Sequence, residues 1–447
     1  MTYQENITLM EKVKPNINYV VKHDLCTGCG ICVGACPFNA ITTIVKSGRF
    51  LPSIDPTLCR NNKGCHRCMD VCPGIGCNLA QMEKETQTEA ANEDMLVGKY
   101  EQCFTGHSTD EDLRFHSASG GMVTQMLVWL LETGRIDGAV VTAFDNSNPL
   151  MVNTFIATTR EELIRAKGSK YAPVSLHNAA KLIKQANGNK YVVVGMPCHI
   201  QGLRKQTQAD KKLRAKIVAY FGLYCSCGRT FNLTEYVLKE RNIKREELTY
   251  FAYRDEGCLG NMVAKQRPRY QDCHSNSETS LYEKDEVYRE RYQNYYHPLR
   301  SFFIPKRCLF CIDHYARLAD MSFGDIHVKP YSDDKIGINS VVARTPLMVE
   351  WLKQAKADGK IALDELPVEV LNKSQGMARR KFARVGTFMK AAKLFGSKVP
   401  EYDLPLPANR FVKNGLDYVQ TRMQQFIGSH KSLWPIIKIL KSKPPKE

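Results

Sequence analysis

Two runs of cysteines near the N-terminus restrict the possible folds of this 447-residue chain more than any other feature. The chain has 17 cysteines, and they are clustered rather than spaced as in a disulfide framework. Clustered thiols in a chain of this length indicate metal binding in a reducing compartment, so we expect a cytoplasmic protein. The runs are Cys26-x2-Cys29-x2-Cys32-x3-Cys36-Pro37 and Cys59-x5-Cys65-x2-Cys68-x3-Cys72-Pro73.

The first run resembles the motif of bacterial two-cluster ferredoxins, in which three thiolates bind one 4Fe–4S cluster and the cysteine before proline binds the other. The second run repeats this arrangement, which predicts two clusters with crossed ligation. Three extra residues separate Cys59 from Cys65, and Cys77 lies nearby, so either Cys59 or Cys77 completes the second site. Zinc is the alternative, but an isolated zinc site does not need interleaved Cys-Pro ends. The predicted ligand sets are Cys26, Cys29, Cys32 and Cys72 for one cluster, and Cys36, Cys59, Cys65 and Cys68 for the other.

From about Tyr100 onward the sequence alternates between helical and strand patterns, which predicts an α/β body. Four more cysteines lie at or after the ends of predicted elements in this body: Cys198, Cys225, Cys308 and Cys311. Because strand ends converge in α/β sheets, these four thiols are candidates for a third 4Fe–4S site. The alternative is a catalytic or redox Cys198 with a zinc knuckle at Cys308 and Cys311. The pattern predicts helices over 121–134, 161–167, 174–185 and 346–358, and strands over 136–144, 190–195 and 215–224.

Two turns of small residues in the body are candidates for binding the phosphates of a dinucleotide. The turn 117–121 (SASGG) precedes a predicted helix, and free amides at a helix N-terminus attract phosphate. The turn 168–171 (GSKY) lies between two predicted helices. We interpret His116 and His199, which lie beside these segments, as hydrogen-bonded structural residues. The candidate cofactor-binding residues are Ser117, Ser119, Gly120, Gly121, Gly168, Ser169, Lys170 and Tyr171.

The order of the segments SASGG, IDGAVV, GSKYAP, GMPCHIQGLR, GLYC, CLFC and ADMSFGD resembles the beta subunit family of coenzyme F420 hydrogenase and dehydrogenase. The resemblance covers about residues 95–345. It implies a bound FAD lined by the two turns, one 4Fe–4S cluster held by Cys198, Cys225, Cys308 and Cys311, and hydride exchange with the deazaflavin coenzyme F420. The family also contains ferredoxin-linked reductases, so the cofactors are predicted more closely than the substrate.

We therefore expect a flavin and iron–sulfur oxidoreductase with FAD and three 4Fe–4S clusters. It would pass electrons between coenzyme F420 and ferredoxin or a partner subunit. One alternative is a ferredoxin-dependent reductase of an organic substrate that does not use F420. Another is an electron-relay subunit without a substrate site. No residue is assigned as a catalytic acid or base.

The expected division is a lead-in (1–20), a two-cluster ferredoxin domain (21–85), a linker (86–99), a flavin and iron–sulfur domain (100–345) and a basic helical extension (346–447). The predicted fold class is thus α+β for the small domain and α/β for the body. Residues 371–447 contain 16 Lys and Arg against 4 Asp and Glu, so 12 of the 17 net positive charges lie there.

The basic extension indicates an anionic partner, and its solvated helical face is the alternative. Apolar residues interleaved with lysines over 426–443 are typical of a helix lying on a membrane surface, but packing against the body or a partner subunit fits equally well. Aromatic residues there lack the spacing of a base-stacking platform, so we expect no nucleic-acid partner. No uninterrupted apolar stretch approaches the roughly 20 residues of a membrane-spanning helix.

Overall fold

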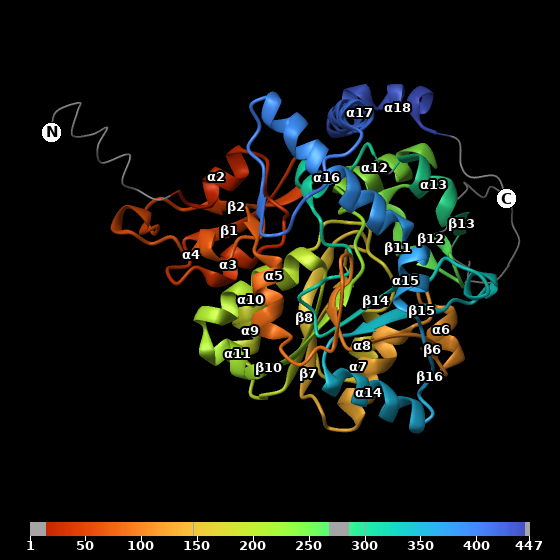
Figure 1. Cartoon of the computed structure of the whole chain (residues 1–447). Helices are drawn as coiled ribbons and strands as arrows, with labels where there is room; N and C mark the ends of the chain where they lie inside the picture. The colour runs from red at the N-terminus through yellow and green to blue at the C-terminus, as the bar shows by residue number, and fades with distance from the viewer. Residues whose placement is uncertain (1–14, 146, 268–285, 300, 443–447) are drawn as a thin grey trace, which may run out of the picture.

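The computed structural model describes residues 15–145, 147–267, 286–299 and 301–442 of the chain (Figure 1). Most of the predicted lead-in and Cys273 therefore lie outside the described residues. The N-terminal module, residues 17–86, is drawn in red and orange in Figure 1 and consists of short helices around a β-hairpin. Its elements are α2 (Ile17–Lys22), α3 (Ile31–Ala35), β1 (Ile41–Lys46), β2 (Arg49–Ile54), η1 (Asn61–Lys63), α4 (Arg67–Asp70), β3 (Gly76–Cys77) and α5 (Leu79–Thr86).

The body is built on an eight-stranded sheet with the order β16-β6-β15-β14-β10-β9-β7-β8. The central strands β14, β10, β9 and β7 are parallel neighbours, and the outer strands pair antiparallel. This mixed sheet confirms the predicted α/β body. The strands are β6 (Gln102–Ser108), β7 (Gly138–Phe144), β8 (Val152–Ala157), β9 (Tyr191–Gly195), β10 (Ile217–Leu223), β14 (Met321–Asp325), β15 (Asn339–Ala343) and β16 (Ile361–Glu365).

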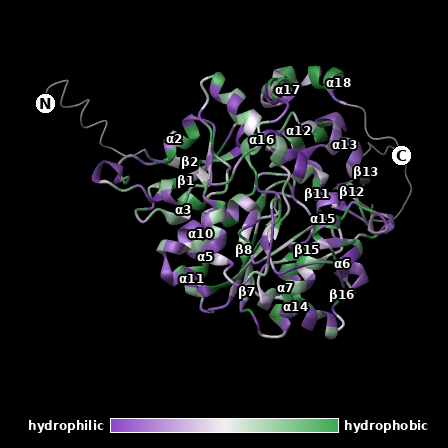
Figure 2. Ribbon diagram, in the orientation of Figure 1, coloured by the Kyte–Doolittle hydropathy of each residue, from purple (hydrophilic) through white to green (hydrophobic). Residues whose placement is uncertain are grey.

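Alternate residues of the central strands pack into two different hydrophobic cores, one on each face of the sheet. Val192 packs in one core with residues of the largely apolar helix α7 (Figure 2) and of α14. Val193 packs in the other core, which also contains residues of the N-terminal module. Successive strand residues point to opposite faces, so the module shares its core with one face of the body. The helices of the body are α6 (Glu111–Phe115), α7 (Met122–Glu132), α8 (Arg160–Arg165), α9 (Ala179–Gln185), α10 (Pro197–Ala209), α11 (Lys211–Lys216) and α14 (Pro346–Ala357).

A smaller antiparallel sheet, β11-β12-β13, packs with two helices beside the main sheet. Its core is rich in aromatic side chains, including Phe251, Tyr253, Tyr295 and Phe303, all about 1–2% exposed. The elements of this part are α12 (Phe231–Glu240), η2 (Arg245–Glu247), β11 (Leu248–Asp255), β12 (Asn261–Gln266), β13 (Glu286–Arg291) and α13 (Tyr292–Leu299).

The C-terminal extension is mostly helical, as predicted, and it contacts both earlier parts of the chain. Strand β16 pairs with β6 at the edge of the main sheet, so the sheet continues past residue 345, where the sequence analysis divides the chain. Strand β17 pairs in parallel with β3 of the N-terminal module. The predicted domain division therefore stays a prediction. The elements of the extension are α15 (Val368–Ser374), α16 (Gly376–Leu394), β17 (Glu401–Tyr402), α17 (Phe411–Ser429) and α18 (Trp434–Leu440).

Two segments adopt structure that the sequence pattern does not predict. The predicted linker contains a hairpin of β4 (Asn92–Asp94) and β5 (Gly98–Tyr100), whose turn is closed by amides that donate to the Asp94 carboxylate. The helix predicted over 174–185 forms only over α9, because the preceding segment contacts the N-terminal module, where the Leu176 amide donates to the Cys29 carbonyl (2.9 Å).

The apolar residues of the C-terminal segment divide between the body and the surface. Trp434 and Ile437 are buried in the aromatic core of the smaller sheet, whereas Ile439 is 83% exposed. Packing against the body thus accounts for part of the amphipathic pattern, and membrane contact stays a prediction. Among the described residues, no helix combines the length and apolar character needed to cross a bilayer.

Candidate redox site

The first four predicted ligands surround one small cavity. Cys26, Cys29, Cys32 and Cys72 line a cavity of about 20 Å³ beside the β1–β2 hairpin. Burial and neighbouring thiols, including Cys29 and Cys72, raise the pKa of Cys26 to about 12. Main-chain amides donate to Sγ of Cys26 (3.4 Å) and of Cys72 (3.3 Å). The fold thus brings Cys72 to the first run, and amide-to-sulfur hydrogen bonds are a feature that suits an iron–sulfur cluster.

The second predicted set gathers around α4 and the turn before it. Burial raises the pKa of the Cys68 thiol, and the neighbouring Cys59 and Cys65 thiols raise it further. Cys36 ends α3, which contacts α4. Cys77 faces elsewhere: its Sγ lies 3.5 Å from Sδ of Met82, and the charged groups that affect its pKa do not include another cysteine. This geometry favours Cys59 over Cys77 as the fourth ligand.

We predict that Cys59→Ser lowers the iron content by about four atoms per chain, because a 4Fe–4S cluster needs four thiolates. Cys77→Ser is the matched control, and we expect it to keep all the iron and to lower stability slightly through loss of a buried apolar contact. Iron and sulfide analysis of anaerobically purified protein checks both. Iron loss in the Cys77 variant with none in the Cys59 variant would reverse the assignment.

The third predicted set meets at the carboxyl ends of adjacent parallel strands. Cys198 follows β9 at the start of α10, and Cys225 follows β10, the neighbouring strand. Cys308 lies in the short helix η3 (Lys306–Phe310), and Cys311 follows directly after it. Burial and the thiols of Cys225, Cys308 and Cys311 raise the pKa of Cys198 well above its ordinary value. The amide of Gly228 donates to Sγ of Cys308 (3.3 Å).

The third set lies next to the first. After burial, the Cys29 thiol has the largest effect in raising the pKa of the Cys198 thiol. Helix α10 makes this approach, because it packs so closely on α3 that a Cβ at Gly202 would lie 2.8 Å from Ile31 Cγ1. On the same helix, Lys205 Nζ donates to the Cys72 carbonyl (3.2 Å). One helix therefore contributes to both cysteine sites.

The two turns of small residues, 117–121 and 168–171, which we call the glycine-rich turns, converge on a buried arginine that no sequence pattern predicts. Arg254, on β11, donates to the carbonyl of Ala118 in the first turn and to Tyr171 Oη in the second (3.4 Å). The same guanidinium forms an ion pair with Asp325 at the end of β14 (2.8 Å). The turns are therefore held at one place beside the carboxyl ends of the central strands, where α/β sheets bind ligands.

Several side chains of the two turns already form hydrogen bonds within the protein. The hydroxyls of Ser117 and Ser119 donate to main-chain carbonyls, at 2.6 Å and 2.9 Å, so they do not point freely at a ligand. Gly121 adopts φ 75° and precedes α7, whose first amide, of Met122, already donates to Asn339 Oδ1 (3.1 Å). Lys170 Nζ donates to the carbonyls of Lys167 (2.9 Å) and Gly168 (3.0 Å) and thus closes the end of α8. The hydroxyls and the Lys170 ammonium group are thus occupied by contacts within the protein.

An aromatic contact joins the second turn to the third cysteine set. The rings of Tyr171 and Tyr296 have centroids 4.4 Å apart. The Cys225 and Cys227 thiols lie close enough to Tyr296 to raise the pKa of its hydroxyl. A ligand held by the two turns would therefore adjoin the third set. Tyr296 and Arg254 belong to a region without a clear sequence pattern, and no sequence signal identifies them.

Both histidines beside the site are in structural environments. His199 is 1% exposed, accepts a hydrogen bond from the Met196 amide (3.2 Å) and contacts the Val174 carbonyl (3.1 Å). Burial lowers its pKa to about 4, so it is neutral at physiological pH. His116 Nδ1 lies 2.9 Å from Asp255 Oδ1. Across the described ranges, no three His, Cys, Asp or Glu side chains are arranged to hold a single metal ion.

Comparison with known proteins identifies the family. Models of the N-terminal and C-terminal parts of the coenzyme F420 hydrogenase/dehydrogenase beta subunit match residues 103–181 and 188–369. A 4Fe–4S binding domain model matches residues 19–42. The two beta-subunit models thus include the third cysteine set and both glycine-rich turns.

Curated relatives agree with the family models. The coenzyme F420 hydrogenase subunit beta of Methanosarcina barkeri is 24% identical over 68% of this chain and 96% of its own length. The coenzyme F420-dependent sulfite reductase of Methanocaldococcus jannaschii is 26% identical over 78% of this chain and 49% of its own length.

A solved structure shows the same fold. A chain of the F420-reducing [NiFe] hydrogenase complex from Methanosarcina barkeri superposes with a TM-score of 0.51 at 23% identity, covering 69% of this chain and 98% of its own. The chain belongs to the coenzyme F420 hydrogenase/dehydrogenase beta subunit family of oxidoreductases and carries a 4Fe–4S binding domain before the parts that define the family.

Proposed function

We propose that this protein exchanges electrons between coenzyme F420 and ferredoxin or a partner redox subunit, using one FAD and three 4Fe–4S clusters. The observation that carries this proposal is the position of Cys198, which lies among Cys225, Cys308 and Cys311 and also next to Cys29. A ligand at the glycine-rich turns, the third cysteine set and the first cysteine set would then be consecutive neighbours. The names of the relatives supply F420 as the two-electron carrier.

The residues of the chain would hold the cofactors as follows. Arg254 fixes the two glycine-rich turns, whose amides would bind the FAD phosphates. The first, second and third sets of cysteines would hold one cluster each, and the amides near Cys26, Cys72 and Cys308 would donate to sulfur. When bound, FAD exchanges electron pairs with F420 and single electrons with iron–sulfur clusters.

The polypeptide would bury the clusters and hold their sites close to one another. The cysteines of the first set are 7–8% exposed, so the protein excludes water from that site. The relatives from hydrogenases are subunits, which supports a partner redox subunit for this chain. The excess of cations in residues 371–447 would favour a partner with an acidic surface.

The direct test is the cofactor content of anaerobically purified protein, followed by reduction with F420. We expect about twelve iron atoms, matching sulfide and one FAD per chain, with bleaching of the flavin absorbance by reduced F420. The same content without bleaching would reject F420 as the carrier and favour a ferredoxin-fed reductase. Full iron without flavin would favour an electron-relay subunit. Zinc in place of iron would contradict the whole assignment.

A further inference from the structure

A buried lysine from the C-terminal extension reaches the third cysteine set. Lys381 lies on α16 and is only 5% exposed. Its Nζ donates to the main-chain carbonyl of Cys225 (3.0 Å) and to that of Asp313 (2.8 Å). Cys225 is a predicted ligand, and Asp313 is two residues beyond Cys311, so the ammonium group lies against the loops that carry two of the ligands.

The charges around Lys381 show which groups its ammonium faces. The thiols of Cys311, Cys225 and Cys308 and the carboxyl group of Asp313 all raise the pKa of Lys381 above its ordinary value. Asp313 also has other partners, since its carboxylate accepts from Gln201 Nε2 (2.9 Å) and the Arg317 amide (3.1 Å). Lys381 is therefore not neutralised by a dedicated carboxylate partner.

The other buried cations that the described residues place near the third set make different contacts. Arg229 donates to Cys227 Sγ (2.8 Å) and to the Gly228 carbonyl (2.9 Å), and neither residue is a predicted ligand. Arg307 is buried and also lies near Cys308 and Cys311, but its guanidinium donates to the carbonyls of Gly74 (2.7 Å) and Pro73 (2.9 Å) in the N-terminal module. Burial and Lys381 lower the pKa of His314 to about 3, so that imidazole is neutral. Within the described ranges, Lys381 is the cation whose side chain donates to the main-chain carbonyl of a predicted third-set ligand.

We propose that Lys381 is a positioning residue that holds a fixed positive charge against the third iron–sulfur cluster and raises the reduction potential of that cluster. This rests on the third cluster of the proposed function. Adding an electron makes a thiolate-bound cluster more negative, and a cation in a buried site is poorly screened, so it stabilises the reduced form. Lys381 lies beyond residues 188–369, so a segment outside the family models would adjust a site inside them.

The test is a potentiometric titration of the anaerobic holoprotein, followed by electron paramagnetic resonance. We expect Lys381→Met to keep the wild-type iron content and to lower the reduction equilibrium constant of the third cluster at least tenfold, equivalent to about 59 mV for one electron. Lys381→Arg, which keeps the charge, should retain the wild-type potential. Lys390→Met, at an exposed position of the same helix, is the matched control and should leave every potential unchanged.

The variant Lys381→Gln tests the effect of the positive charge apart from that of the hydrogen bonds. It also replaces Lys381→Met in the test if the Met variant does not fold. It removes the positive charge but keeps an N–H donor, so it should shift the potential in the same direction. Unchanged potential in a fully loaded Met or Gln variant would overturn the proposal, as would a shift in Met that is absent from Gln. A Cys198→Ser protein that keeps the full wild-type iron content would instead contradict the third cluster itself, independently of Lys381.

Discussion

Replacement of Cys198 by serine is expected to remove about four of about twelve iron atoms and to lower F420-dependent reduction of an external one-electron acceptor by at least about 100-fold. Cys198 is the predicted ligand of the third set that also lies next to Cys29 of the first set, so its loss should separate the proposed flavin site from the N-terminal module. The flavin content and the iron of the N-terminal module should stay at wild-type values.

Cys103→Ala is the matched control for this prediction. Cys103 is 2% exposed on β6, and the charged groups that affect its pKa do not include another cysteine. We expect this variant to keep its iron and its activity. The measurements are iron, sulfide and flavin analysis together with steady-state reduction of the acceptor. Full activity in a Cys198→Ser protein that has lost the third cluster would show that electrons bypass this site.

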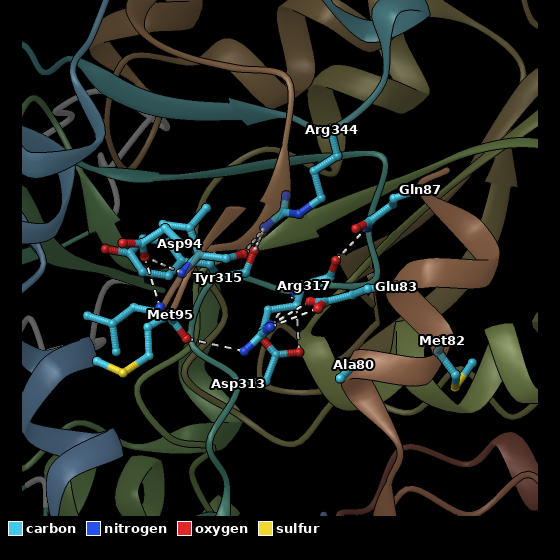
Figure 3. Close-up of polar contacts among 12 residues, drawn as sticks. Ala80, Met82, Glu83, Gln87, Asp94, Met95, Asp313, Tyr315, Arg317 and Arg344 are labelled. Carbon is cyan, nitrogen blue, oxygen red and sulfur yellow. Dashed lines mark hydrogen bonds and ion pairs between the residues drawn. The ribbon is translucent and has the colours of Figure 1, made fainter. Parts of the chain in front are cut away.

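Arg317→Met is expected to lower the free energy of unfolding by about 3–5 kcal/mol, because it leaves a buried carboxylate without its partner. Arg317 donates to both oxygens of Glu83, at 2.5 Å and 2.7 Å, and the two side chains are 4% and 2% exposed (Figure 3). Glu83 belongs to α5 of the N-terminal module and Arg317 to the body. Gln87, one turn later on the chain, donates to the Arg317 carbonyl (2.6 Å).

The loss should depend on pH in a defined direction. Burial raises the pKa of Glu83 above 4.5, and Arg317 opposes that rise. In Arg317→Met, burial raises the pKa of Glu83 without opposition from the arginine. At a pH above 4.5, Glu83 therefore keeps its proton in the folded state and loses it in the unfolded state. The stability deficit should therefore be smallest below pH 4.5 and should grow as the pH increases above it.

Denaturant unfolding of the anaerobic holoprotein, followed by circular dichroism and by cluster absorbance, measures the effect. The double variant Glu83→Gln with Arg317→Met should recover part of the loss, because it buries no charge. Arg289→Met is the control: its ion pair with Glu256 lies at the surface, with the arginine side chain 52% exposed, so we expect a change of about 1 kcal/mol or less. An equal effect of Arg289→Met and Arg317→Met would contradict the prediction.

The sequence predicts those parts of the site that depend on local spacing. The two cysteine runs and the strand that precedes Cys198 are short-range patterns. The structure has β9 before Cys198, and Cys26, Cys29, Cys32 and Cys72 line one cavity. Arg254 and Lys381 could not be predicted, because their contacts join residues 136 and 156 positions apart. The ion pair between Glu83 and Arg317 could not be predicted for the same reason, since the two residues are 234 positions apart.

The parallel pairing of β17 with β3 has a consequence for how electrons reach the protein. The strands approach so closely that a Cβ at Gly76 would lie 1.9 Å from the Glu401 carbonyl oxygen, and the Asp403 carboxylate accepts from the first amides of α5. This part of the C-terminal extension therefore holds the N-terminal module through backbone pairing and two hydrogen bonds. Electron transfer inside the molecule then requires no swinging of a carrier domain, so its rate should be insensitive to solvent viscosity, and only the encounter with an external carrier should slow in viscous solution.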